Sequence, residues 1–353
     1  MKFIHCADVH LGSKMEAKLP REKAEERRGE VRATFLRMVE FAKKEGVRAI
    51  LLAGDVFDCD RPLKRDKEFF YEVVKGTPEI DFLYLRGNHD SEESYTEANL
   101  ENLKTFGEEW SGYSYGDIHI CGIEISEQNA MSLYTTLKLD KEKKNVVLLH
   151  GQTSQSVGVD KIVLSKLTDK NIDYLALGHI HRPQFVTDNA RYSGSPFAMS
   201  FDEDYPHSVS VVEIGEDGLS VREREIAPLV PVYTVPQEAG GVDEALEAIR
   251  NLPAGRAYLR VKLKVRDVVP MQERMAIQEA VAETQHMLCD IQPVREGRVT
   301  EASGSFAVEE IRHISPLDVA LDYYSMRFGG EMDDELKGML EQCIEKAEKE
   351  DEQ

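Results

Sequence analysis

Five short apolar runs in the first half of the chain each end abruptly in a polar, mostly glycine-containing turn. The runs are Lys2–Cys6, Ala49–Ala53, Phe82–Leu85, Val146–Leu149 and Tyr174–Leu177. Runs of this length bounded by polar turns are typical of buried strands. Apolar residues recur at helical spacing over positions 22–45, between the first two runs. Strand, helix and strand in succession predict a parallel sheet in an α/β fold.

The turns after these runs carry Asp, Asn and His. They read Ala7-Asp8-Val9-His10, Gly54-Asp55, Gly87-Asn88-His89-Asp90, His150-Gly151 and Gly178-His179-Ile180-His181. In layered α/β folds, the loops that leave the carboxyl ends of neighbouring strands converge on one crevice. We therefore expect five turns that are distant in sequence to build one site.

Seven side chains in these turns are candidate metal ligands. They are Asp8, His10, Asp55, Asn88, His150, His179 and His181. The spacing of Asp8 and His10 points both side chains to one side of an extended backbone, and His179 and His181 repeat it. Imidazole and oxygen donors without a thiolate suit Mn²⁺, Fe²⁺ or Zn²⁺ better than Ca²⁺. Seven donors are enough for two ions that share a carboxylate.

Two divalent ions facing two aspartates would leave a positive centre, which attracts phosphate. Paired divalent ions promote in-line displacement at phosphorus, so the donor set predicts phosphoester hydrolysis. His89 is the natural non-ligand histidine, able to protonate the leaving oxygen or stabilise the transition state. Asp90 is either a cap or a partner that orients His89.

Composition limits the partners of the chain. Its 44 Lys and Arg against 65 Asp and Glu give a net charge of −21, so nucleic-acid contacts must be local or helped. No apolar run approaches the roughly 18 residues of a membrane span, and we expect a cytoplasmic protein. The five cysteines include no CxxC pair, so we expect reduced thiols.

A second small α/β unit is expected after a boundary near Pro228, Pro231 and Pro236. Its expected elements are strand Val230–Val235, helix Val242–Leu252, a strand over Arg256–Arg266, helix Met271–Leu288 and a final strand. The middle strand alternates apolar residues with a basic set that includes Arg260 and Lys262. That basic face is either a solvated outer face or a strip that faces nucleic acid.

Two amphipathic helices are expected in the tail, the first beginning after Ser315. Their apolar stripes would either dock a partner helix or coiled coil, or pack on the body of the protein.

The motifs DxH, GD, GNHD, a later H and GHxH resemble the calcineurin-like metallophosphoesterase superfamily. The resemblance implies a four-layer α/β/β/α sandwich over 1–227, a small α/β capping domain that contacts DNA over 228–305, and a helical docking tail over 306–353. It also implies that Asp8, His10, Asp55 and His181 hold one metal ion and that Asp55, Asn88, His150 and His179 hold the second. His89 would be the catalytic acid.

Within the superfamily, the chain resembles the SbcD-type nuclease subunits in its opening Phe3–Gly12 and in Gly54-Asp55-Val56-Phe57-Asp58 followed by Arg61-Pro62. This resemblance implies a nuclease that acts in DNA repair, as a 3′ to 5′ exonuclease on duplex DNA and as an endonuclease on single strands or hairpins. The implied metal is Mn²⁺, with Mg²⁺, Fe²⁺ and Zn²⁺ as alternatives. It implies a homodimer bound through its C-terminal helices to an SbcC-like ABC-type coiled-coil ATPase. Asp58 stands where archaeal and eukaryotic relatives tend to carry another histidine, and with Asp90 it is a candidate supporting residue.

Basic residues near the motif loops, and on the expected strand over Arg256–Arg266, are candidates for DNA contact. They are Lys14, Arg61, Lys64, Arg65, Arg182, Arg260 and Lys262. Each of those near the motif loops could equally be a solvated surface charge. Two alternatives stay open: the same chemistry on a nucleotide, cyclic phosphodiester or phosphoprotein, and a scaffold that joins ATPase heads.

Overall fold

The structure is a computed structural model that describes residues 1–15, 19, 21–58, 62–91, 94, 100–153, 158, 160–216, 218–266, 268–295 and 337. The chain divides into the unit Met1–Glu296 and the unit Gly297–Gln353. The predicted helical tail over 306–353 lies outside the described residues, apart from Lys337, and so does Arg61.

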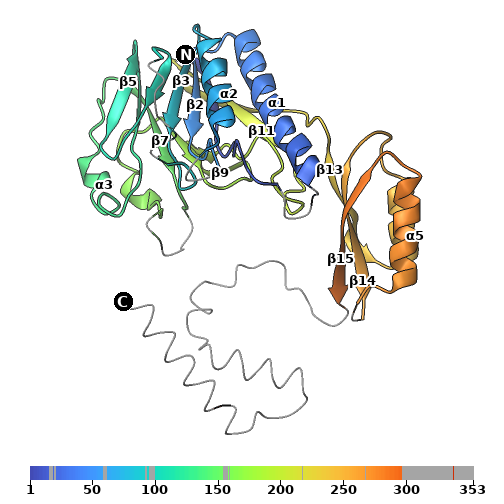
Figure 1. Cartoon of the computed structure of the whole chain (residues 1–353). Helices are drawn as coiled ribbons and strands as arrows, with labels where there is room; N and C mark the ends of the chain where they lie inside the picture. The colour runs from blue at the N-terminus through green and yellow to red at the C-terminus, as the bar shows by residue number, and fades with distance from the viewer. Residues whose placement is uncertain are drawn as a thin grey trace. The chain divides into compact units, whose positions relative to one another are not determined.

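The first sheet has six strands in the order β12-β11-β1-β2-β3-β4 (Figure 1). Its strands are β1 (Lys2–Cys6), β2 (Ala49–Ala53), β3 (Asp81–Leu85), β4 (Leu103–Thr105), β11 (Ser208–Gly215) and β12 (Gly218–Glu225). Strands β1 to β4 run parallel, as the strand–helix–strand order predicts, while β11 and β12 are antiparallel additions at one edge.

The second sheet also has six strands, in the order β5-β6-β7-β8-β10-β9. Its strands are β5 (Ser111–Tyr115), β6 (Ile118–Gly122), β7 (Lys144–His150), β8 (Tyr174–Gly178), β9 (Gln184–Thr187) and β10 (Ala190–Tyr192). Strands β6, β7, β8 and β10 are parallel, and β5 and β9 pair antiparallel at the two edges.

Three apolar clusters fix the layers. Helices α1 (Arg21–Glu45) and α2 (Lys64–Lys75) pack on one face of the first sheet, as with Phe35 against the cluster that contains Ile50. The neighbouring Leu51 points the other way and packs between the two sheets, because side chains alternate along a strand.

The outer face of the second sheet is covered by the short helix α3 (Leu133–Thr136), the 3₁₀ turn η2 (Leu164–Lys166) and their loops. The expected α/β/β/α sandwich is therefore confirmed, with a fourth layer made of short helical turns.

A third sheet of three parallel strands follows, in the order β13-β14-β15. Its elements are β13 (Val232–Gly240), α4 (Val242–Arg250), β14 (Tyr258–Val265), α5 (Met271–Ala282) and β15 (Met287–Arg295). We call this sheet with its two helices the capping sheet (Figure 1). It has an apolar cluster of its own. The predicted domain boundaries at 227 and 305 stay predictions.

The prediction of one helix over Met271–Leu288 is wrong at its carboxyl end. Helix α5 ends at Ala282, and Met287 begins β15, where it pairs with Tyr258 of β14. Sheet pairing decides the outcome there, because the intervening residues contain neither Gly nor Pro to end the helix.

The basic face of β14 is not uniformly exposed, in contrast to both sequence-based interpretations. Tyr258 and Arg260 are buried, Lys262 is half-buried and Lys264 is exposed. The Tyr258 hydroxyl donates to Glu30 of α1 at 2.9 Å, so the first half of this face packs against the rest of the unit. The alternation along the strand is correct, but the sequence does not reveal what covers the face.

Among the described residues, no helix is both long and apolar enough to cross a membrane. Cys6, Cys121 and Cys289 are free thiols within the described part of the chain.

Candidate metal centre

The seven predicted donors meet where strands from both large sheets end. Asp8 and His10 follow β1, Asp55 follows β2, and Asn88 follows β3. From the second sheet, His150 ends β7, and His179 and His181 follow β8. Convergence is expected because parallel strands of one sheet end at the same edge.

The first group of donors comprises Asp8, His10 and His181, whose ligand atoms lie within 4.8 Å of one another. The Nε2 atoms of His10 and His181 are 3.1 Å apart. Two metal–nitrogen bonds of about 2.0–2.1 Å at a right angle span nearly this distance. Both rings therefore present a nitrogen to one point, as a shared cation requires.

The second group comprises Asp55, His150 and His179, again within 4.8 Å. Asn88 Oδ1 lies 3.0 Å from His150 Nε2 and 3.0 Å from His179 Nδ1. Asp55 Oδ2 is 3.3 Å from His150 Nε2 and 4.0 Å from His10 Nε2 of the first group. Asp55 thus lies between the groups, where a carboxylate shared by two ions would sit.

Four of the donors have backbone in the left-handed region, which side-chain-bearing residues rarely adopt. The φ angles are 54° at Asp8, 52° at His10, 52° at Asp55 and 104° at His179. Such angles persist only where the surroundings over-determine them, and they cluster at functional sites. Here backbone hydrogen bonds connect the loops. The amide of Asp8 donates to the carbonyl of Gly54 at 3.0 Å, and the amide of His10 donates to the carbonyl of Asp55 at 3.0 Å.

Glycines in the motifs let the two sheets approach closely. A Cβ on Gly54, whose φ is +93°, would lie 2.1 Å from His150 Nδ1. A Cβ on Gly178 would lie 1.8 Å from the carbonyl oxygen of Ala53 on the facing sheet. These glycines therefore set the distance between the β2 and β8 turns.

Substituting Gly178→Ala is expected to destabilise the protein by about 3 kcal/mol or more, because a backbone carbonyl cannot move aside without parting the sheets. Gly107→Ala is the matched control, since its Cβ would meet nothing within 4 Å. Denaturant unfolding of both variants checks this. An equal loss in the two would contradict the steric account.

Carbonyl and carboxylate groups outside the centre orient the imidazole rings. His150 Nδ1 lies 2.9 Å from the Ala53 carbonyl, to which it donates, so Nε2 faces the centre. His181 Nδ1 lies 2.8 Å from Glu203 Oε1. Such partners fix the ring orientation and the tautomer that can bind a metal.

Asp58 and Asp90 support the centre in different ways. Asp58 Oδ1 lies 3.1 Å from His10 Nδ1 and 3.2 Å from His89 Nδ1, so one carboxylate joins both rings. Asp90 accepts hydrogen bonds from the backbone of Phe57 at 2.8 Å and of Gly87 at 3.0 Å. These bonds tie two loops of the candidate centre together, and the two predicted roles of Asp90, a cap or a partner that orients His89, stay predictions.

Sequence reasoning missed three residues around the rings. Glu203 contacts His181, and Gln152 and Asp160 lie 2.9 Å and 3.6 Å from His179 Nε2. The sequence offers a signal for one of these residues: Gln152 stands two positions after the predicted ligand His150.

The predicted DNA-contact residues have different surroundings. Lys14 and Arg182 are exposed, and Arg182 follows a donor of the centre directly. Lys64 is exposed and lies 3.5 Å from Glu68, while Arg65 lies 2.8 Å from Glu25. Arg260 is buried and ion-paired with Asp202 at 2.7 Å. Lys262 is half-buried.

Comparison with known proteins places this geometry in a family. The model of the calcineurin-like phosphoesterase family matches residues 1–183, just over half of the chain. The chain belongs to this family. The resemblance seen in the motifs is thus confirmed, and the protein is a metal-dependent phosphoesterase. A second model, the type 5 capsule protein repressor C-terminal domain, matches residues 228–328.

Relatives extend the match beyond the family domain. The chain is 24% identical to the SbcD subunit of nuclease SbcCD from Bacillus subtilis over 95% of both chains. It is 27% identical to the DNA double-strand break repair protein Mre11 of Sulfurisphaera tokodaii over 57% of this chain and 55% of that one. A dimetal phosphatase of known structure from Danio rerio is 11% identical, with a TM-score of 0.43 over 65% of this chain and 97% of that one.

The residues present fit the divalent ions that this phosphoesterase family implies. Burial raises the pKa of Asp8. Burial would also raise the pKa of Asp55, but His150 and His10 together hold it below its usual range. Burial lowers the pKa of His150, yet Asp55 overrides this effect and raises it to about 9. Without metal, bound protons therefore balance the negative charge of the buried carboxylates. Bound cations would replace these protons.

Metal loading is therefore expected to release about one proton from His150 at pH 7.5, because its Nε2 must be neutral to bind an ion. The raised pKa means that His150 is protonated below about pH 9, so Mn²⁺ affinity should rise with pH up to that value. Calorimetric titrations in two buffers of different ionisation enthalpy measure the released protons. A binding enthalpy that is the same in both buffers would contradict the prediction.

Proposed function

We propose that this phosphoesterase is a two-metal DNA nuclease that acts in double-strand-break repair. The observation that carries the proposal is the pair of donor groups joined at Asp55, in a chain that aligns over nearly its full length with a nuclease subunit. The activities proposed are 3′ to 5′ exonuclease on duplex DNA and endonuclease on single strands or hairpins.

Each donor group would hold one ion. Asp8, His10, Asp55 and His181 would hold the first, and Asp55, Asn88, His150 and His179 the second. Mn²⁺ is the proposed metal, because the set combines imidazole and oxygen donors without thiolate. When bound, the ions would attract the phosphate and lower the pKa of the attacking water.

His89 is placed to move a proton at the rim of the centre. Its side chain is 50% exposed, while Asp58 holds its Nδ1 at 3.2 Å. The ring packs edge-on against His10, with ring centroids 5.1 Å apart. This arrangement leaves Nε2 to protonate the leaving oxygen of the substrate.

The net charge of −21 means that DNA contacts must be local or helped by a partner. Exposed Lys14 and Arg182 stand on the loops of the centre and are the proposed contacts, whereas Arg260 already bonds within the protein. An SbcC-like ATPase, bound through the predicted C-terminal helices of a homodimer, would supply the remaining contacts. This partner and this assembly are part of the proposal.

Linear duplex DNA labelled at either end, incubated with Mn²⁺ and the protein alone or with its ATPase, tests the proposal. We expect shortening from the 3′ ends and cleavage of a hairpin, both abolished by chelation. Hydrolysis of a small diester with no cutting of DNA would favour the small-substrate alternative. Hydrolysis of neither substrate, with ATPase binding retained, would favour the scaffold.

A further inference from the structure

Glu203 connects the metal centre to a loop that the capping sheet holds. Its Oε1 accepts a hydrogen bond from His181 Nδ1 at 2.8 Å, and its Oε2 accepts one from the backbone amide of Met199 at 2.8 Å. The side chain is largely buried. The orientation of the His181 ring therefore depends on the position of the loop over 198–203. We call this loop the coupling loop.

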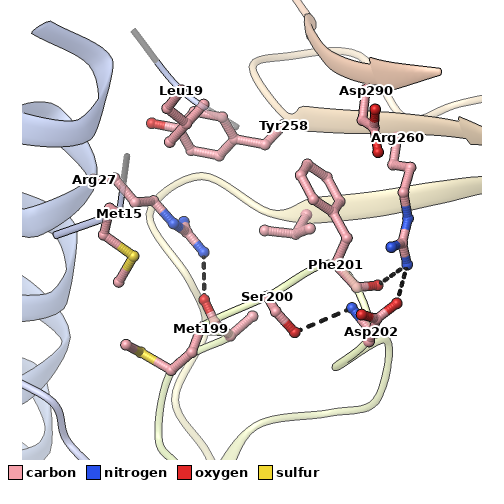
Figure 2. A pocket seen from close by; sticks show the side chains of 12 residues that line it. Met15, Leu19, Arg27, Met199, Ser200, Phe201, Asp202, Tyr258, Arg260 and Asp290 are labelled. Carbon is pink, nitrogen blue, oxygen red and sulfur yellow. Dashed lines mark hydrogen bonds and ion pairs between the residues drawn. The ribbon is translucent and has the colours of Figure 1, made fainter. Parts of the chain in front are cut away.

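Arg260 of β14 holds the middle of the coupling loop. Its Nη2 donates to the carbonyl of Phe201 at 2.6 Å and to Asp202 Oδ1 at 2.7 Å (Figure 2). Thr234 of β13 adds a hydrogen bond from its hydroxyl to the same carbonyl at 3.2 Å. Two strands of the capping sheet thus form hydrogen bonds with the residues immediately before Glu203.

Arg27 of α1 holds the start of the loop, donating to the carbonyl of Ala198 at 2.9 Å (Figure 2). A cavity of about 260 Å³ lies between Arg27, Phe201 and Arg260. The cavity is open to solvent, so the loop lacks packed neighbours on this side and its polar contacts contribute much of its positioning. The hydrogen bonds of Arg260 are therefore among the contacts that set where Glu203 stands, beside that of Arg27 and the 3.2 Å contact between His207 Nε2 and the Glu203 carbonyl.

We propose that Arg260 is a positioning residue, which transmits the placement of the capping sheet through the coupling loop to Glu203 and the ring of His181. The inference rests on the proposed metal centre and gives it a means of regulation. A displacement of the capping sheet that frees Phe201 would loosen one ion and leave the ion held at His150 and His179 in place.

Titration of the full chain with Mn²⁺, followed by calorimetry, tests this coupling. Arg260→Met is expected to weaken binding of one ion by up to about tenfold, the lower end of the loss caused by removing the outer partner of a ligand, because it acts through Glu203, and to leave the other ion unchanged. His181→Ala identifies which ion is affected. Arg266→Met, an exposed residue next to the same strand, is the matched control and should change neither affinity.

Glu203→Gln should weaken the same ion, and combining it with Arg260→Met should add nothing, since both act through one contact. Asp202 is 81% exposed, so Asp202→Ala spares the fold and should shift the same affinity less than Arg260→Met does. Unchanged affinities in Arg260→Met, equal losses at both ions, or additive effects would overturn the coupling.

The failure of the proposed function is distinguishable from the failure of the coupling. A chain that binds two ions and shows this pattern, but does not cut DNA, contradicts the nuclease alone. A wild-type chain that binds no Mn²⁺ overturns the metal centre and the coupling together.

Discussion

His89→Asn is expected to slow DNA cleavage by about 10²–10⁴-fold while two ions remain bound, because asparagine cannot donate a proton to the leaving oxygen. The substitution removes no metal donor in the proposed assignment. Single-turnover cleavage of duplex DNA with saturating Mn²⁺, together with metal analysis of the same sample, measures both quantities.

The type of leaving group separates proton transfer from a structural effect. A diester whose leaving group is a weak base needs little protonation, so His89→Asn should affect its hydrolysis far less than DNA cleavage. His119→Asn, at a half-buried position of β6, is the control and should leave both rates unchanged. Equal losses on the two substrates would count against His89 as the acid.

Asp55→Ala is expected to lower the metal content of the protein, whereas His89→Asn should leave it unchanged. Asp55 stands between the two donor groups, 3.3 Å from His150 and 4.0 Å from His10, so its loss removes a donor from both proposed ions. Losing an outer partner alone costs about 10–100-fold in metal affinity, and losing a shared ligand should cost more. Equilibrium dialysis should find at most one ion per chain, with DNA cleavage abolished.

Asp188→Ala, an exposed carboxylate in the turn between β9 and β10, controls for the loss of one negative charge. It should retain both ions. If Asp55→Ala still bound two ions with native affinity, the shared position of this carboxylate would be refuted.

The strands and the turns after them could be predicted because their signals are local. Strands β1 and β2 span the predicted runs Lys2–Cys6 and Ala49–Ala53. Continuous apolar runs report burial on both faces, and sheet geometry then brings the residues after parallel strands together. Seven donors distant in sequence could therefore be assigned to one place before their distances were known.

The outer partners of the rings could not be predicted in the same way. Glu203 stands 22 positions after His181 in the acidic run Asp202–Asp204, with no motif spacing to mark it. Its contact depends on the path of the coupling loop, which Arg27 and Arg260 determine through long-range contacts. Loop paths of this kind leave no periodic signal in the sequence.

Tertiary contacts also overrode two local patterns in the capping sheet. Met287 and Leu288 could continue the helical period of α5, but pairing with β14 makes them a strand. Arg260 alternates correctly onto the basic face, yet that part of the face packs on the coupling loop. A basic residue on a predicted strand face therefore indicates orientation, and exposure must be established separately.

Anomalous diffraction from crystals of the full chain grown with Mn²⁺ tests the central claim most directly. We predict two peaks about 3.5–4 Å apart, one beside His10 and His181, the other beside His150 and His179, with the Asp55 carboxylate between them. A single peak, or peaks away from these side chains, would contradict the account.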